Sequence, residues 1–171
     1  DHLSDGEPAV PSLYAQMFLS KTLDGSPLPD DPAELPSKNL LISENAAAIA
    51  AACGIGADDI DRLRTDPLVI QNDRLILANL SALYRHALLA RIVQLPVRHY
   101  LRALRLIAAD PFVATATKRN TANSLDFVMA IERIANSGFS VDDLDYLLRH
   151  SSSSTSGLAI VESDIGAVLD I

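Results

Sequence analysis

Aromatic residues and cysteines are scarce in this sequence. It contains no tryptophan, and aromatic side chains make up only 5% of the residues although hydrophobic residues reach 49%. The core must therefore consist mainly of Leu, Ile, Val and Ala, which suits closely packed helices. The single cysteine, Cys53, cannot form an internal disulfide, which excludes a disulfide-stapled domain but leaves secretion open. We expect Cys53 to be a small buried residue at the end of an alanine-rich stretch, and not a nucleophile.

Long apolar runs are also missing. No stretch approaches the roughly 20 apolar residues that a membrane-spanning helix needs, so we expect no transmembrane segment. Residues 1–5 show no basic region followed by an apolar one, so we expect no signal peptide here. The 171 residues suffice for one domain of ordinary size, and the missing initial methionine suggests a piece of a longer protein.

Basic charge is scarce overall but concentrated in one region. The net charge is −8, which argues against nucleic acid as the main partner. Residues 1–50 hold eight acidic and two basic side chains, whereas residues 74–119 hold seven arginines, one lysine and a single acid, Asp110. This basic stretch could meet an acidic surface of a neighbouring subunit or of the same chain.

The pattern of apolar residues predicts an all-α fold, because no run alternates like a strand for more than four residues. Residues 1–42 carry six prolines and form a predicted irregular segment with one short helix, at 12–20. Residues 43–171 form the predicted helical domain, in which Ser43 caps the first helix and Thr121 or Asn123 caps the fifth. Its helices are expected at 43–53, 56–66, 74–94, 96–110, 124–137, 140–150 and 164–171.

A helix corner recurs three times along the chain, at 53–63, 94–103 and 137–147. In each copy a helix ends, a glycine or leucine and one apolar residue follow, and a new helix begins. We expect an array of helix-turn-helix corners packed as an irregular bundle, and such arrays usually serve as scaffolds. One set of apolar residues is expected to carry the stability of this bundle: Leu80, Tyr84, Leu88, Leu104, Ile131, Leu144 and Leu147.

The polar residues suggest helix stabilisation rather than chemistry. The pairs Asp58/Asp59 and Asp142/Asp143 lie in predicted first turns, where negative charge complements the helix dipole. No two histidines have the spacing of a metal site, and we expect helix-surface or helix-end roles for His2, His86, His99 and His150. No phosphate-binding loop or nucleophile motif is present. The sequence therefore predicts no catalytic, cofactor-binding or metal-binding residues, and no enzyme.

One candidate interaction face is visible. Arg98, Arg102 and Arg105 are spaced four and three residues apart, which places them on one side of a helix. This arginine face is either solvated or a docking surface for carboxylates of a neighbouring helix, to which guanidinium groups are well suited.

An ordered set of motifs resembles the A subunits of bacterial Tc (toxin complex) insecticidal toxins. The set comprises LSALYRHALLAR at 80–91, LPV at 95–97, DPF at 110–112, Phe127-Val128, Ile131, SGFSVDDLDYLLRH at 137–150 and Gly157-Leu158. The resemblance covers roughly residues 40–171. It implies a fragment of the α-helical shell of a very large chain that assembles as a homopentamer around a translocation channel.

The resemblance also implies the partners. They are the rest of the A subunit, its copies in the pentamer, and the B and C subunits that carry the toxic enzyme; only other regions of the parent chain would meet a membrane. Such a protein is secreted or associated with the cell surface. The residues by themselves leave two alternatives: a free-standing helical module that binds a peptide or helix in a groove, and a small helical enzyme that uses His86 or His99.

Overall fold

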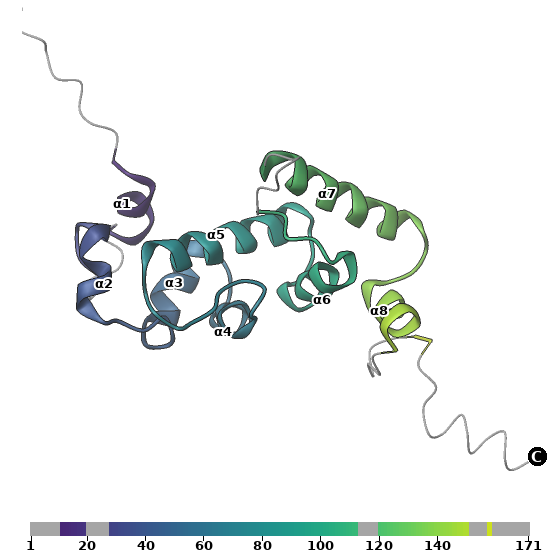
Figure 1. The fold of residues 1–171 in the computed structure, drawn as a ribbon, viewed down its shortest axis with the longest axis horizontal. Coiled ribbons are helices and arrows are strands. Elements are labelled where there is room, and N and C mark those ends of the chain that lie inside the picture. The colour runs from purple at the N-terminus through teal and green to yellow at the C-terminus, as the bar shows by residue number, and fades with distance from the viewer. Residues whose placement is uncertain (1–10, 20–27, 113–119, 151–156, 159–171) are drawn as a thin grey trace, which may run out of the picture. The chain divides into compact units, whose positions relative to one another are not determined.

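The computed structural model describes residues 11–19, 28–112, 120–150 and 157–158 (Figure 1). Within these ranges the fold is all-α, with helices packed against one another and no strand. The helices are α1 (Leu13–Phe18), α2 (Leu35–Lys38), α3 (Ala46–Cys53), α4 (Ala57–Thr65), α5 (Leu77–Ile92), α6 (Val97–Ile107), α7 (Asn120–Asn136) and α8 (Val141–Arg149), with short 3₁₀ turns at Pro32–Glu34 and Ser43–Asn45. The expected helix at 164–171 lies outside the described residues.

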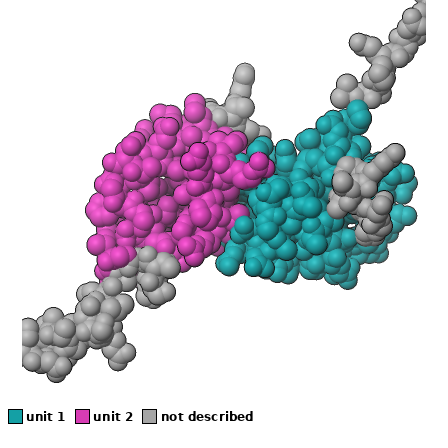
Figure 2. Space-filling model, turned by 180° about the vertical axis from the view of Figure 1, so that it is seen from behind, with its two compact units in different colours: residues 1–88 teal, residues 89–171 magenta. Residues whose placement is uncertain are grey.

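The chain divides into two compact units, residues 1–88 and residues 89–171, and the division falls within α5 (Figure 2). The domain boundary predicted between residues 42 and 43 stays a prediction. The two units are considered separately below.

In the first unit, α3 packs against both α4 and α1. The contact is apolar: Ile49 of α3 and Ile60 and Leu63 of α4 are fully buried. On α1 the rings of Tyr14 and Phe18 lie 5.5 Å apart, and the Tyr14 hydroxyl donates a 2.9 Å hydrogen bond to the carbonyl of Pro29. As expected, Cys53 is buried at the end of α3, and burial raises the pKa of its thiol to about 11.

The irregular N-terminal segment holds more helix than its prolines suggest. Besides α1, the short helix α2 forms around Pro36. Pro36 occupies the first turn of α2, where a backbone N–H would have no partner within the helix, so its missing N–H costs little there.

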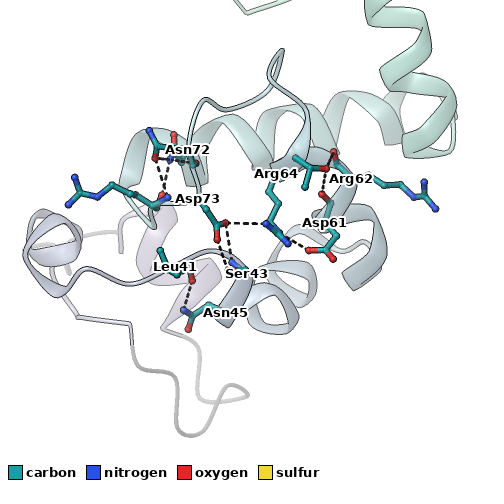
Figure 3. Close-up of polar contacts among 11 residues, drawn as sticks. Leu41, Ser43, Asn45, Asp61, Arg62, Arg64, Asn72 and Asp73 are labelled. Carbon is teal, nitrogen blue, oxygen red and sulfur yellow. Dashed lines mark hydrogen bonds and ion pairs between the residues drawn. The ribbon is translucent and has the colours of Figure 1, made fainter.

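Two predicted helix starts in the first unit are wrong, and contacts between residues 40–43 and residues 73–75 explain both. Leu41 and Arg74 form an isolated antiparallel bridge, and the amide of Leu75 donates to the carbonyl of Leu40 at 2.9 Å. The helix expected from residue 74 therefore begins only at Leu77. Ser43 does not cap α3, because its hydroxyl donates a 2.5 Å hydrogen bond to Asp73 Oδ2 (Figure 3).

A polar network surrounds this bridge (Figure 3). Arg64 of α4 lies 2.6 Å from Asp61 Oδ1 through its Nε and 3.6 Å from Asp73 Oδ1 through its Nη1. Asn79 is buried, and its side-chain amide donates a hydrogen bond to the carbonyl of Arg74 at 2.7 Å. These contacts join the start of α5, the end of α4 and the chain that leads into α3.

Two of the three predicted corners share one hydrogen-bond pattern. At the end of α3, the amides of Gly54 and Ile55 donate to the carbonyls of Ala51 and Ala50, at 3.2 and 3.1 Å. This pair of hydrogen bonds is a Schellman motif, and Gly54 has the left-handed φ of +67° that the motif requires.

The end of α5 repeats the pattern with Gln94 in the place of glycine. The amides of Gln94 and Leu95 donate to the carbonyls of Arg91 and Ala90, at 3.1 and 3.0 Å, and Gln94 has a φ of +56°. The third corner is different: Gly138 has a φ of +81°, and the Ser137 hydroxyl accepts a 3.2 Å hydrogen bond from the amide of Phe139.

In the second unit, α6 packs against α8 and α7. The centre of the α6–α7 contact is an edge-to-face pair of Tyr100 and Phe127, whose ring centroids lie 5.6 Å apart and whose planes meet at 71°. Both rings are buried, and burial together with the nearby Asp110 carboxylate raises the pKa of Tyr100. Helix α7 begins at Asn120, ahead of both predicted capping residues, Thr121 and Asn123, so neither of them caps it.

The residues expected to carry stability fall into three groups. Leu80, Leu104 and Ile131 are buried, as predicted. Tyr84, Leu88 and Leu144 are half-buried. For Leu147 the prediction is wrong: its side chain is 45% exposed, because α8 turns Asp142 and Asp145 inward instead.

Candidate interaction site

The arginine face lies on α6, which begins after Pro96 and carries all three predicted side chains. Arg98 and Arg105 are exposed, whereas Arg102 is partly buried beside α8. Arg105 Nη1 donates a 3.3 Å hydrogen bond to the carbonyl of Leu101 on its own helix. The three side chains therefore share a helix face, as predicted, but they have different surroundings.

Arg102 has a carboxylate partner within the same unit. Its Nη1 atom donates to Oδ1 of Asp142, the second residue of α8. His99, one turn earlier on α6, places Nε2 3.5 Å from Asp142 Oδ2. A guanidinium group and an imidazole ring thus meet the two oxygens of one carboxylate.

The Asp142 side chain is only 6% exposed, which makes these neighbours energetically important. A carboxylate that loses water must regain hydrogen bonds and opposite charge, or its burial is strongly unfavourable. The Arg102–Asp142 pair therefore joins α6 to α8 and fixes which side of α8 faces inward. Removing Arg102 alone would leave the carboxylate with less compensation.

Asp143, the neighbour of Asp142, has the helix-start role that the sequence predicts. Ser140 and Asp143 form a capping box: the Asp143 amide donates to Ser140 Oγ at 3.1 Å, and the Ser140 amide donates to Asp143 Oδ2 at 3.1 Å. The other oxygen, Oδ1, accepts a 3.0 Å hydrogen bond from the amide of Gly157. Asp143 thus also holds a later part of the chain beside the start of α8.

An open groove of about 370 Å³ adjoins this cluster, lined by residues of α6, α7 and α8 and their connections. Its apolar lining comprises Leu95, Ile131, Ile134, Ala135, Phe139 and Val141. Its polar lining comprises Arg98, His99, Ser140 and Asp142. Phe139 is 44% exposed and Ala135 is exposed, so the groove presents apolar surface to solvent beside the cationic Arg98.

The lining of this groove provides two features for binding. The apolar wall can receive apolar side chains, and Arg98 can pair with a carboxylate at the edge. The Asp142 carboxylate is already engaged by Arg102 and His99, so it does not give the groove an unpaired negative charge.

The other ionisable residues singled out in the sequence have structural surroundings. Asp58 and Asp59 lie in the first turn of α4, as expected for helix-start residues. Asp145 is buried and lies 3.4 Å from Arg149 Nη1, one turn further along α8. Among the described part of the chain, no group of three or more His, Cys, Asp or Glu side chains could hold a metal ion.

The histidine expectations are partly wrong. His86 is buried on α5 instead of lying on a helix surface. His99 faces Asp142, while His150 is the exposed residue that ends α8, with a left-handed φ of +56°. His2 lies outside the described residues.

The groove residues on α7 and after it have no signal in the sequence that singles them out. Ile134, Ala135 and Phe139 look like ordinary apolar positions of a helix and its corner, and only the approach of α6 and α8 makes them one surface. Asp142 is also missed, because adjacent Asp residues at a helix start are usually solvated. A pattern that could have suggested its burial is the set of three arginines on the neighbouring helix.

Comparison with known proteins adds no relative. The chain matches no protein-family model, no curated protein and no solved structure. No helix among the described residues has both the length and the apolar character needed to cross a membrane.

Proposed function

We propose that this chain is a structural, non-catalytic segment of the A subunit of a Tc-type toxin complex and belongs to its α-helical shell. The observation that carries the proposal is the ordered set of motifs from residue 80 to residue 158. The all-α fold of the described residues supports it, because a shell segment should consist of packed helices.

The surroundings of the motif residues add physical support. The LPV motif contains Leu95 of the second corner, and the SGFSVDD motif contains the capping box and the buried Asp142. Such residues hold the angle between consecutive helices, and a shell that must keep its shape during toxin delivery needs rigid corners. In this proposal the mechanism is mechanical: apolar corners keep the helices in place, and charged faces contact neighbouring parts of the assembly.

The partners follow from the same proposal. They are the rest of the A subunit, four further copies in a pentamer, and the B and C subunits, with secretion or cell-surface association as the location. The exposed Arg98 and Arg105 are the candidate contacts of this segment with a neighbouring acidic helix.

A second candidate function is a free-standing helical interaction module. The groove beside α6 favours it, since exposed apolar surface flanked by an arginine is typical of a peptide-binding site. This candidate predicts a monomer without a very long parent chain.

The reading frame that contains this sequence distinguishes the two candidates. The toxin proposal predicts a very long frame with an apolar helical channel segment downstream and genes for B and C subunits alongside. A frame that stops close to residue 171 would contradict the toxin proposal and favour the interaction module.

The double exchange Arg98→Gln and Arg105→Gln in the full-length protein tests the contact role of the arginine face. We expect the fold to be retained and the yield of assembled oligomer to fall, as measured by size-exclusion chromatography with light scattering. Arg133→Gln, an exposed exchange on α7, is the control. Equal oligomer yields for all variants would reject the docking role and leave this face solvated.

A further inference from the structure

Helix α8 reverses the usual arrangement of a helix at a protein surface. Such a helix normally buries its leucines and exposes its acids. In α8, Asp142 and Asp145 are buried, whereas Leu147 is 45% exposed and Leu148 is 68% exposed. The side of α8 that faces away from α6 therefore presents apolar surface to solvent.

The exposed leucines belong to one continuous face. Leu144, Leu147 and Leu148 have the spacing i, i+3 and i+4, which places them side by side on the helix, and Leu144 is half-buried. We call these three residues the leucine face. Single exposed leucines are common at protein surfaces, but a continuous apolar face is typical of a contact with another molecule.

The two ends of α8 carry opposite charges, and these indicate which molecule suits the face. Asp143 lies in the first turn, and Arg149 lies in the last turn, beside its own Asp145 and with a side chain that is 44% exposed. Two parallel copies of α8 would place like charges side by side. Two antiparallel copies would place the acidic first turn of each helix beside the basic last turn of the other. A reversed copy of α8 thus complements both the leucines and the charges.

We propose that the leucine face binds the same face of a second copy of this chain, with the two α8 helices antiparallel about a two-fold axis. Such a pairing closes on itself and gives a dimer, so it is distinct from the contacts around a pentameric ring and does not rest on the proposed function. Two faces of three leucines bury less than the roughly 1,200 Å² at which stable interfaces begin. We therefore expect a weak dimer, with a dissociation constant on the order of 0.1–1 mM.

Sedimentation equilibrium of the 171-residue chain at about 0.15 M salt, where repulsion between distant charges is screened, tests the contact. We expect the mean mass to rise from monomer towards dimer between about 10 µM and 1 mM. Leu148→Lys should raise the dissociation constant at least tenfold, because it places a charge in the apolar contact. Leu125→Lys changes an exposed leucine of α7 in the same way and should leave it unchanged. Circular dichroism checks that both variants remain folded.

Two outcomes of this experiment would overturn the proposal. A chain that stays monomeric up to about 1 mM has no such contact. Equal effects of Leu148→Lys and Leu125→Lys would show that association does not involve the leucine face.

Exchanges at His150, the exposed residue that ends α8, test the antiparallel orientation. His150→Lys should lower the dissociation constant about threefold, because it adds positive charge beside the acidic first turn of the second copy. His150→Glu should raise it by a similar factor. Asn136→Lys and Asn136→Glu, at the exposed end of α7, change the net charge in the same way and should have smaller effects.

The pattern of these effects distinguishes the orientations. Parallel helices would bring both copies of residue 150 together, so either exchange would raise the dissociation constant through repulsion of like charges. That result would overturn the antiparallel pairing. Equal responses at residues 136 and 150 would overturn it as well, because they would reflect net charge alone.

Discussion

The first and third corners contain nearly the same sequence but bury opposite sides of their second helix. Asp58-Asp59-Ile60-Asp61-Arg62-Leu63 in α4 corresponds to Asp142-Asp143-Leu144-Asp145-Tyr146-Leu147 in α8. In α4, Ile60 and Leu63 are fully buried. The first and third aspartates of this helix, Asp58 and Asp61, are exposed. In α8 the first and third aspartates are buried, and Leu147 is largely exposed.

The neighbouring helix explains this difference. Helix α4 packs against α3, which consists of alanines, one isoleucine and a cysteine and offers no charge to a carboxylate. Helix α8 packs against α6, which offers Arg102 and His99 to Asp142. A repeated motif thus predicts a helix and its start, but the partner surface selects the side that is buried.

The largest expected effect is at the buried leucine of the first copy. Leu63→Ala should lower the free energy of unfolding by about 2–5 kcal/mol, because it removes a fully buried side chain and leaves a cavity. The equivalent change Leu147→Ala should cost less than about 0.5 kcal/mol, as for most exposed positions. Urea unfolding of both variants measures the difference. Similar losses would contradict the exposure of the Leu147 side chain.

The next effect concerns the ion pair that holds α8 in its orientation. Arg102→Ala should cost about 2–3 kcal/mol, because it removes a charged partner from a buried carboxylate. Adding Asp142→Asn to this variant should recover part of the loss, since the remaining side chain carries no charge. Urea unfolding of the single and double variants gives the coupling between the two residues. Purely additive losses would show that the pair does not stabilise the contact between α6 and α8.

Smaller changes in stability are expected at the two Schellman corners. Gly54→Ala should cost about 1–2 kcal/mol, because an L side chain is strained at a φ of +67°. Gln94→Gly should raise stability by up to about 1 kcal/mol, because it relieves the same strain at a φ of +56°. Thermal unfolding by circular dichroism should therefore show melting-temperature shifts of opposite sign. Shifts of the same sign would indicate that the Gln94 side chain makes a stabilising contact of its own.

The smallest expected effects distinguish the helix starts of α4 and α8. Ser140→Ala should cost about 1 kcal/mol, because the capping box loses its hydroxyl group. Gly56 occupies the equivalent position before α4 and provides no side-chain cap; a Cβ atom there would have Asp59 Oδ2 as its nearest neighbour, at 4.0 Å. Gly56→Ser should therefore stabilise the first unit by a few tenths of a kcal/mol. Amide exchange in the first turns of α4 and α8 measures both changes, and a loss of protection in Gly56→Ser would contradict the capping argument.

Local patterns were sufficient to predict the helical class, the three corners and the capping box. These features depend on interactions between residues that are close in sequence. Gly54 and Gly138 permit a left-handed turn, and the Ser140 hydroxyl accepts a hydrogen bond from the amide of Asp143. The arginine face of α6 was predictable for the same reason, since spacing alone places the three side chains on one side.

Contacts between residues that are distant in sequence account for the predictions that were wrong. The late start of α5 depends on the bridge between Leu41 and Arg74, and the hydrogen bond that takes Ser43 away from α3 depends on Asp73, thirty residues later in the chain. The groove likewise exists only because three helices meet around Ile134 and Phe139.

The sequence by itself determined that this chain forms short helices joined at tight corners, because capping side chains, left-handed turns and apolar spacing act locally. The side that each helix buries was decided by tertiary structure. Asp142 and Asp58 occupy equivalent positions in similar stretches of sequence, but Asp142 is buried beside Arg102 and His99 of another helix, which pair with its carboxylate. A buried charge depends on a partner in space, and a motif of eleven residues does not specify that partner.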